Sequence, residues 1–298
     1  MSEHKEEACI FFDLDGTLFD QPYNKNPISE KNKMAIMLAK NHANVVFSTG
    51  RMHSNPKVLK SMHELGITDI IASGGGEIYI NNQLFYSENI SKIDVLEIVK
   101  FANENKISFT INDVNGESYY SHNKFQSWLA KMIMSKRFIK IGLRNHFDIT
   151  HHKNIIKISL IFTSPIRSLH MFKKLNELYK ASLNFTLAAN DYVIEITSGS
   201  TSKALATKKY LEFKGIKKQN SMHFGDSMSD AVLKGYVGKL IAMGNSSQNF
   251  KEVADEIAPH YRKGGIFKYF LQNGFTFGNN EDKLINYETI EIQEEKND

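Results

Sequence analysis

The chain has 298 residues, of which 41% are hydrophobic and 23% charged, proportions typical of a soluble globular protein long enough for two domains. No apolar run approaches the roughly 20 residues needed to span a bilayer, so we expect no membrane partner. Residues 1–7 are charged and lack the apolar core of a signal peptide, and the single cysteine, Cys9, excludes an internal disulfide. Together these features predict a cytoplasmic protein.

The net charge of +4 is unevenly distributed along the chain. Residues 276–298 hold seven acidic residues and two lysines, and we predict that they form an acidic C-terminal tail. Residues 84–190 hold fifteen Lys or Arg against eight Asp or Glu. This basic region either suits an anionic small substrate or is a solvated surface without a binding role. It lacks the dense Arg/Lys stripe with interleaved aromatic residues that would indicate a nucleic-acid partner.

Apolar strand patterns and helical patterns alternate over the first 80 residues. Strands are predicted at 8–13, 43–48 and 68–73, with helices from Ser29 to about residue 41 and from about 54 to Gly66. Strands separated by helices indicate a parallel, Rossmann-like sheet with right-handed crossovers. The same alternation of strands and helices returns after residue 190, with strands near 193–196, 221–224 and 239–242 and a helix from Ser202.

The middle of the chain has a different pattern, in which hairpin-like strands are interspersed with helices near 91–105, 123–136 and 166–180. It predicts an α+β module inserted into the first domain. We therefore expect a core domain at 1–82 and 190–275, an inserted module at 83–189 and the tail at 276–298. Within the module, Trp128 is predicted to lie in a helix's buried stripe, and the adjacent His151 and His152 to lie at the surface.

The segment Asp13-Leu14-Asp15-Gly16-Thr17 carries the most chemical information. It follows an apolar run, so both carboxylates lie where a buried strand ends, and open α/β sheets bind ligands at such strand ends. Of two aspartates brought together there, one can attack and the other can move a proton, while a divalent cation suppresses their repulsion. Taken alone, Asp-x-Asp-Gly is also common in loops.

Three further segments place polar groups at predicted strand or helix ends. Ser48-Thr49-Gly50-Arg51 offers hydroxyls, a free amide and a guanidinium fork to phosphate oxygens. Lys203, in the first turn of a helix, is placed to neutralise a nucleophile and a phosphoryl group. Asp226 and Asp230 follow a strand, and hard oxygen ligands of this kind suit Mg²⁺. Each segment alone also fits a surface loop or a helix cap.

The order of these four segments resembles that of the haloacid dehalogenase superfamily of phosphatases. It is most similar to the Cof-type subgroup, in which a large type IIB cap is inserted between the second and third motifs. The resemblance covers the chain to about residue 273. It implies an α/β fold with a Rossmann-like parallel sheet as the core domain and residues 83–189 as an inserted α+β cap that sets substrate specificity.

The resemblance also implies a role for each matching residue. Asp13 is the implied nucleophile, which forms an aspartyl phosphate, and Asp15 the acid that protonates the leaving oxygen and then activates water. Thr49 matches the hydroxyl position, with Ser48 as the alternative, and Lys203 matches the third motif.

The implied cofactor is Mg²⁺, held by Asp13, Asp226 and the backbone carbonyl of Asp15. Asp230 either supports the residues that bind the metal or binds the metal directly. Here Ser229 stands where the Cof-type fourth motif has Asn, from which we expect retained activity and a less rigid metal loop.

Backbone amides near Gly16 and Gly50, together with Arg51, are predicted to bind the substrate. The sequence Ser73-Gly74-Gly75-Gly76 replaces the family's Ser-Asn-Gly-Ala, so Gly74 and Gly75 keep accessible amides and lose an amide side chain. Asn245, in a segment that matches the family, is predicted to face the site.

These features predict a Mg²⁺-dependent phosphatase that hydrolyses a small soluble phosphomonoester, such as a sugar phosphate, a nucleotide or a phosphorylated cofactor. The partner is a small phosphorylated metabolite, and we expect a monomer or a weak homodimer. Two alternatives stay open. One is a phosphotransferase or mutase that passes the same aspartyl phosphate to an alcohol, and the other is a non-catalytic phospholigand-binding protein.

Overall fold

The computed structural model describes residues 7–274 except 23, 25, 114–115, 122–140, 145, 190 and 263, and only the backbone at 141–144. The larger of its two β-sheets has eight strands in the order β14-β13-β12-β1-β2-β3-β4-β5. These are β1 (Cys9–Phe12), β2 (Asn44–Ser48), β3 (Asp69–Ala72), β4 (Glu77–Ile80), β5 (Gln83–Ser87), β12 (Ser221–Gly225), β13 (Lys239–Ala242) and β14 (Glu256–Ile257). The strands from β14 to β3 run parallel, which confirms the predicted Rossmann-like core.

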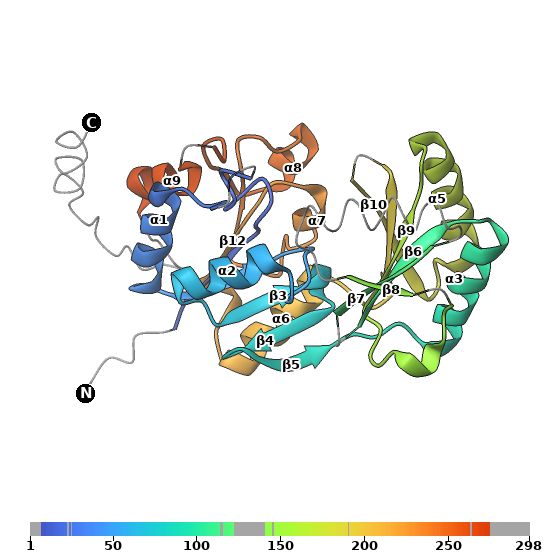
Figure 1. Ribbon diagram of the computed structural model, residues 1–298. Helices are drawn as coiled ribbons and strands as arrows, with labels where there is room; N and C mark the ends of the chain where they lie inside the picture. The colour runs from blue at the N-terminus through green and yellow to red at the C-terminus, as the bar shows by residue number, and fades with distance from the viewer. Residues whose placement is uncertain are drawn as a thin grey trace.

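Helices cover both faces of this sheet (Figure 1). On one face, α1 (Glu30–Lys40), α2 (Pro56–Leu65) and α9 (Gly265–Asn273) pack in a cluster that includes Phe12 and Phe224. On the other, α6 (Lys203–Lys214) and α8 (Gln248–Val253) pack with Phe11. Because both faces of β1 are buried, residues 9–12 read as an unbroken apolar run rather than an alternating one.

Local capping explains where the helices that carry the site begin and end. Ser29 accepts a hydrogen bond from the backbone of Asn32 and so begins α1, as predicted. Gly66 ends α2 with a positive φ of 59°, a conformation that glycine adopts without strain. Ser202 caps α6 through the amide of Ala204, which places Lys203 at the first helical position.

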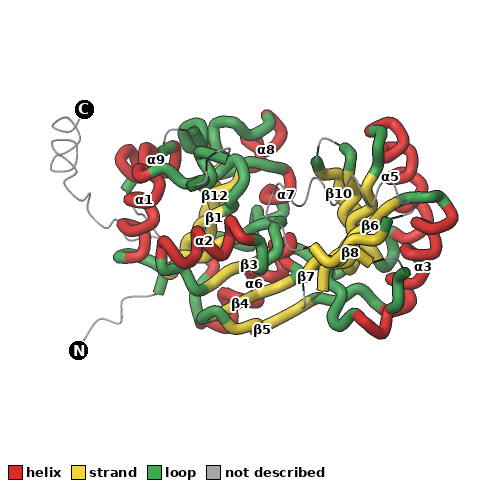
Figure 2. Tube along the Cα trace, in the orientation of Figure 1, coloured by secondary structure: helices red, strands yellow, loops and turns green. Residues whose placement is uncertain are grey.

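The smaller sheet has six strands in the order β10-β11-β9-β6-β7-β8, all antiparallel except the β7–β8 pair. These are β6 (Ser108–Asp113), β7 (Gly116–Tyr120), β8 (Ile141–Arg144), β9 (Lys157–Ile161), β10 (Leu183–Ala188) and β11 (Val193–Ser198). Helices α3 (Lys92–Glu104) and α5 (Pro165–Tyr179) cover its outer face, away from the core domain (Figures 1 and 2). This is the inserted α+β cap.

Strand pairing moves both predicted domain boundaries. Strand β5 pairs with β4 in the larger sheet, and β11 pairs with β9 and β10 in the smaller one. The chain therefore passes from the larger sheet to the smaller one after residue 87 and returns after residue 198. Both crossings come later than the predicted domain boundaries, which follow residues 82 and 189. The alternating pattern of 193–196 identified a half-buried strand but carried no information about its partner. The predicted helix at 123–136, Trp128 and the tail at 276–298 lie outside the described residues.

The prediction that His151 and His152 both lie at the surface is wrong for His152. His151 is exposed, whereas His152 is buried, with Nδ1 donating to Asp113 Oδ2 at 2.6 Å and Nε2 hydrogen-bonded to the Tyr120 hydroxyl. The pair lies at the end of a 3₁₀ turn rather than in a strand, so the expected alternation does not apply. Among the described residues, no helix combines the length and hydrophobicity of a membrane span.

The centre of the larger sheet is held by aromatic packing, which predicts a strong effect of Phe12→Ala. The Phe12 ring is fully buried and stacks on Phe224 with centroids 5.2 Å apart. Its removal should lower the free energy of unfolding by about 3–5 kcal/mol, measured by urea denaturation followed by circular dichroism. Phe213→Ala, at a position 55% exposed, should cost less than about 1 kcal/mol, and equal losses would contradict this account of the core.

Candidate active site

The predicted catalytic residues meet at the carboxyl ends of neighbouring parallel strands. Asp13 directly follows β1, Thr49 follows β2 and Asp226 follows β12, and β1 lies between the other two strands. The amide of Asp13 still donates to the carbonyl of Phe224 at 2.9 Å, so the sheet itself fixes the first residue of the motif. These side chains, with Asp15, Gly50, Arg51 and Lys203, line a cavity of about 1300 Å³ between the core domain and the cap.

Lys203 links two carboxylates inside this site. Its Nζ lies 2.8 Å from Asp13 Oδ1 and 2.8 Å from Asp230 Oδ1, and its side chain is 5% exposed. Burial lowers the pKa of the Lys203 amine, but the charges of Asp13 and Asp230 outweigh burial and raise it. Lys203 therefore remains a cation that orients the Asp13 carboxylate.

Protein donors occupy both oxygens of Asp230. Oδ1 accepts from Lys203 and from His223 Nε2 at 3.0 Å, and Oδ2 accepts from the amide and hydroxyl of Ser227, each at 3.2 Å. Burial favours the neutral acid, but Lys203 and His223 lower the pKa of this carboxyl. Of the two roles predicted for Asp230, these contacts favour support of the site over direct binding of a metal.

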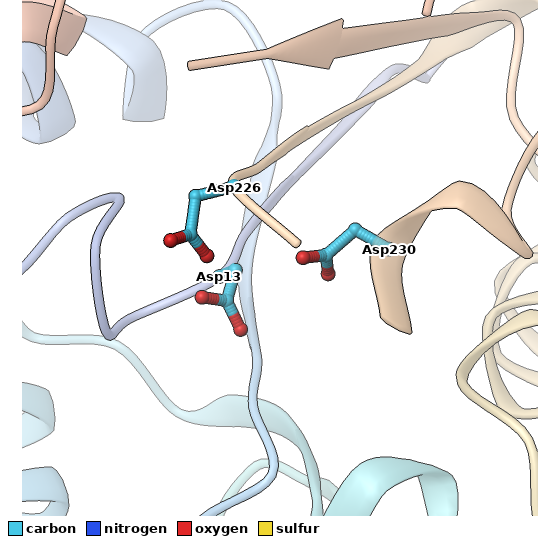
Figure 3. Close-up of side chains that lie close together, drawn as sticks. All are labelled: Asp13, Asp226 and Asp230. Atoms are coloured by element: carbon cyan, nitrogen blue, oxygen red, sulfur yellow. The ribbon is translucent and has the colours of Figure 1, made fainter. Parts of the chain in front are cut away.

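Three carboxylates converge in the site and fit a divalent cation (Figure 3). One oxygen each from Asp13, Asp226 and Asp230 lies within 4.8 Å of the others. Burial, followed by the charge of Asp230, raises the pKa of Asp226 to about 6, and burial also raises the pKa of Asp13. Such crowding of hard oxygen donors is relieved by Mg²⁺, which Asp13 and Asp226 are placed to bind.

Arg51 and Asp15 form a bidentate ion pair. Arg51 Nε lies 2.6 Å from Asp15 Oδ2 and Nη2 lies 2.8 Å from Oδ1, with the Asp15 side chain 50% exposed. The guanidinium fork predicted for phosphate oxygens thus holds the predicted acid instead. Sequence spacing does not reveal this contact, because the two residues come from different strand ends.

The predicted substrate-binding residues take different places around the cavity. Gly50 lines it next to Thr49, which was predicted as catalytic, whereas Gly74 lines a neighbouring cavity of about 490 Å³ that also touches Lys203. Gly75, with φ +101°, packs on the start of α6, where a Cβ would lie 2.3 Å from the carbonyl of Ser202. We therefore assign Gly75 to the positioning of Lys203.

Gly16 and Asn245 support the loop that carries Asp226. A Cβ on Gly16 would lie 2.1 Å from Asp226 Oδ2, so only glycine allows this approach. Asn245 Nδ2 donates to the Gly16 carbonyl at 2.9 Å and to Asp226 Oδ2 at 3.4 Å, while its Oδ1 accepts from the amide of Tyr261. The Asn245 side chain thus connects the three loops that carry Gly16, Asp226 and Tyr261.

Sequence reasoning missed several polar residues at or beside the cavity. His223 holds Asp230 from within β12, and Asn112, Lys157 and Glu195 line the cavity from the cap. The alternation of polar and apolar residues at 157–160 was a usable signal for a sheet with one polar face.

Known proteins resemble the chain over nearly the whole of this structure. A family model described as haloacid dehalogenase-like hydrolase matches residues 10–270. A putative phosphatase of Buchnera aphidicola is 29% identical over 250 residues, which cover 81% of this chain and 86% of the relative. A Bacillus subtilis 5-amino-6-(5-phospho-D-ribitylamino)uracil phosphatase is 26% identical and covers 90% of this chain and 97% of its own length. The crystal structure of a Thermotoga maritima protein shares the fold, with a TM-score of 0.77 at 21% identity over 91% of this chain and 99% of its own.

The raised pKa of Asp226 predicts that Mg²⁺ binding is coupled to proton release. Below a pH of about 6 the carboxyl is increasingly protonated and must lose its proton before it can bind a cation. The affinity for Mg²⁺, measured by calorimetry, should fall by about tenfold or more for each pH unit below 6, because the pKa of Asp13, the other carboxylate ligand, is raised as well. Asp226→Asn should remove most of the binding, and an affinity that is constant between about pH 5 and about pH 7 would contradict the assignment.

Proposed function

The chain belongs to the haloacid dehalogenase-like hydrolase family, and on that premise we propose that it is a Mg²⁺-dependent phosphatase of small phosphomonoesters. The observation that carries the proposal is the buried contact of Lys203 with Asp13, beside a second aspartate two residues along the chain. The Bacillus relative, named a phosphatase of a phosphoribityl compound, supports a small phosphorylated metabolite as the substrate.

Asp13 is the nucleophile in this proposal. One of its oxygens attacks phosphorus, the bond between phosphorus and the leaving oxygen breaks, and an aspartyl phosphate forms. Lys203 holds Asp13 Oδ1 at 2.8 Å and so orients the carboxylate while neutralising charge on the transferring group. The Thr49 hydroxyl and the Gly50 amide, at the end of β2, bind the phosphoryl oxygens.

Asp15 moves the protons. It donates a proton to the leaving oxygen and then takes one from the water that hydrolyses the aspartyl phosphate. Its half-exposed place at the cavity wall supports this role, because the carboxyl can reach a bound substrate. The two hydrogen bonds from Arg51 favour the carboxylate, so one of them must open before Asp15 donates a proton. We assign Arg51 to positioning Asp15.

The residues that would hold Mg²⁺ are Asp13, Asp226 and the backbone carbonyl of Asp15, with Asp230 and Asn245 fixing the loop around them. When bound, the cation neutralises the carboxylates and the charge that develops on the phosphoryl oxygens. The cap lines the other side of the cavity, and its closure over the core would exclude bulk water from the leaving group.

The proposal predicts that each of two isosteric changes lowers kcat. Asp13→Asn should lower kcat by at least roughly 10³-fold, because the amide cannot form the intermediate, and Asp15→Asn by about 10²–10⁴-fold. Release of phosphate from a panel of metabolite phosphates, with and without Mg²⁺, measures both. Glu177→Gln, at an exposed position on α5, is the control that should keep wild-type activity.

The same assay separates the alternative functions. Phosphate transfer that occurs only after an alcohol acceptor is added would identify a phosphotransferase or mutase. Binding of a phosphate ester to the wild-type protein without any turnover in the presence of Mg²⁺ would identify a phospholigand sensor. Either outcome would overturn the hydrolase proposal.

A further inference from the structure

The sheet of the cap has one apolar face and one polar face. On β6, β9 and β11 the apolar residues Phe109, Ile158 and Ile196 belong to the cluster packed under α3 and α5. The residues between them point the other way, since side chains alternate along a strand. In register across the three strands, Ser159 lies between Thr110 and Glu195, and Lys157 lies between Asn112 and Thr197.

This polar face forms the cap side of the catalytic cavity. Asn112, Lys157, Ser159 and Glu195 line the same space as Asp13. Asn112, Lys157 and Ser159 are nevertheless buried, with exposed fractions of 3%, 6% and 8%. A substrate with its phosphoryl group at Asp13 therefore meets these four side chains with its leaving group.

Asn112 presents an acceptor that lacks a partner. Its Oδ1 is buried, and no described residue donates a hydrogen bond to it. A buried acceptor of this kind is stabilised when a ligand brings a hydroxyl or amine donor. The next residue, Asp113, is fixed by His152, so the end of β6 that carries Asn112 is held in place.

Lys157 and Glu195 add a paired donor and acceptor. Lys157 Nζ lies 2.8 Å from Glu195 Oε1 and 3.4 Å from the carbonyl of Gly50, so it also joins the cap to the loop that carries Thr49. Glu117 lines the cavity as well, and the described cap lining thus holds two carboxylates and one ammonium. The basic composition of residues 84–190 is not reflected in this part of the lining.

We propose, on the premise of the phosphatase function above, that Asn112, Ser159, Lys157 and Glu195 form the leaving-group subsite. It takes an uncharged group that carries several hydroxyls. A second phosphate or a carboxylate is disfavoured there, because it would lie against Glu195 and Glu117 while the charge of Lys157 is already neutralised.

A matched pair of substrates tests the charge selectivity. Sorbitol 6-phosphate and 6-phosphogluconate differ only at the far end of the molecule, where one has a hydroxymethyl group and the other a carboxylate. The wild-type protein with Mg²⁺ should show a kcat/KM at least about tenfold higher for sorbitol 6-phosphate. Glu195→Gln should narrow this ratio, and the Glu177→Gln control should leave it unchanged.

Asn112→Leu tests the hydrogen-bonding part with a side chain of similar size. It should lower kcat/KM for sorbitol 6-phosphate about tenfold or more relative to acetyl phosphate, which has no hydroxyl to recognise. Equal kcat/KM for the matched pair in the wild-type protein, or equal losses on both substrates in Asn112→Leu, would overturn the subsite even if Glu195→Gln does not fold.

The outcome for acetyl phosphate separates failure of the subsite from failure of its premise. Turnover of acetyl phosphate without selectivity in the matched pair refutes the subsite alone. Absence of phosphate release from these three compounds and from the whole panel of metabolite phosphates refutes the phosphatase function, and the subsite with it. Release from the panel without activity on sorbitol 6-phosphate refutes the subsite alone.

Discussion

The ammonium of Lys203, held between Asp13 and Asp230, is the contact on which the rest of the site depends. It joins residues 190 positions apart in the chain and places a cation where burial would otherwise make two neighbouring carboxylates costly. The contact requires that α6 begin at the carboxyl edge of the sheet. The Ser202 cap and the close approach of Gly75 fix that starting point.

Four aspartates in one site have different neighbours, and the proposed function gives each of them a separate task. Lys203 orients Asp13, and Arg51 forms an ion pair with Asp15. Both oxygens of Asp230 accept hydrogen bonds from protein donors. Asp226 is less enclosed and has a carboxyl whose pKa burial raises to about 6, as suits a group that exchanges a proton for a metal. The chemistry follows from contacts more than from residue type.

The two sheets serve the site in different ways. Helices cover both faces of the larger sheet, so its polar groups gather at the strand ends, where the proposed catalytic residues lie. In the described part of the cap, helices α3 and α5 cover one face of its sheet, and the other face carries polar side chains into the cavity. The edge of the larger sheet, which carries the motif residues, thus faces the broad polar surface of the cap sheet. Single substitutions on that surface can change which substrate is recognised.

The sequence by itself determined the parallel core, the inserted cap and the starts of α1 and α6, because these depend on local patterns. It also determined the motif residues that the structure brings together, because parallel strands present their carboxyl ends at one edge of a sheet. Only the tertiary structure decided which sheet receives β5 and β11, that His152 is buried, that Arg51 grips Asp15, and that Lys157 pairs with Glu195 in the cavity. Each of these depends on a partner distant in the chain, and local periodicity carries no record of such a partner.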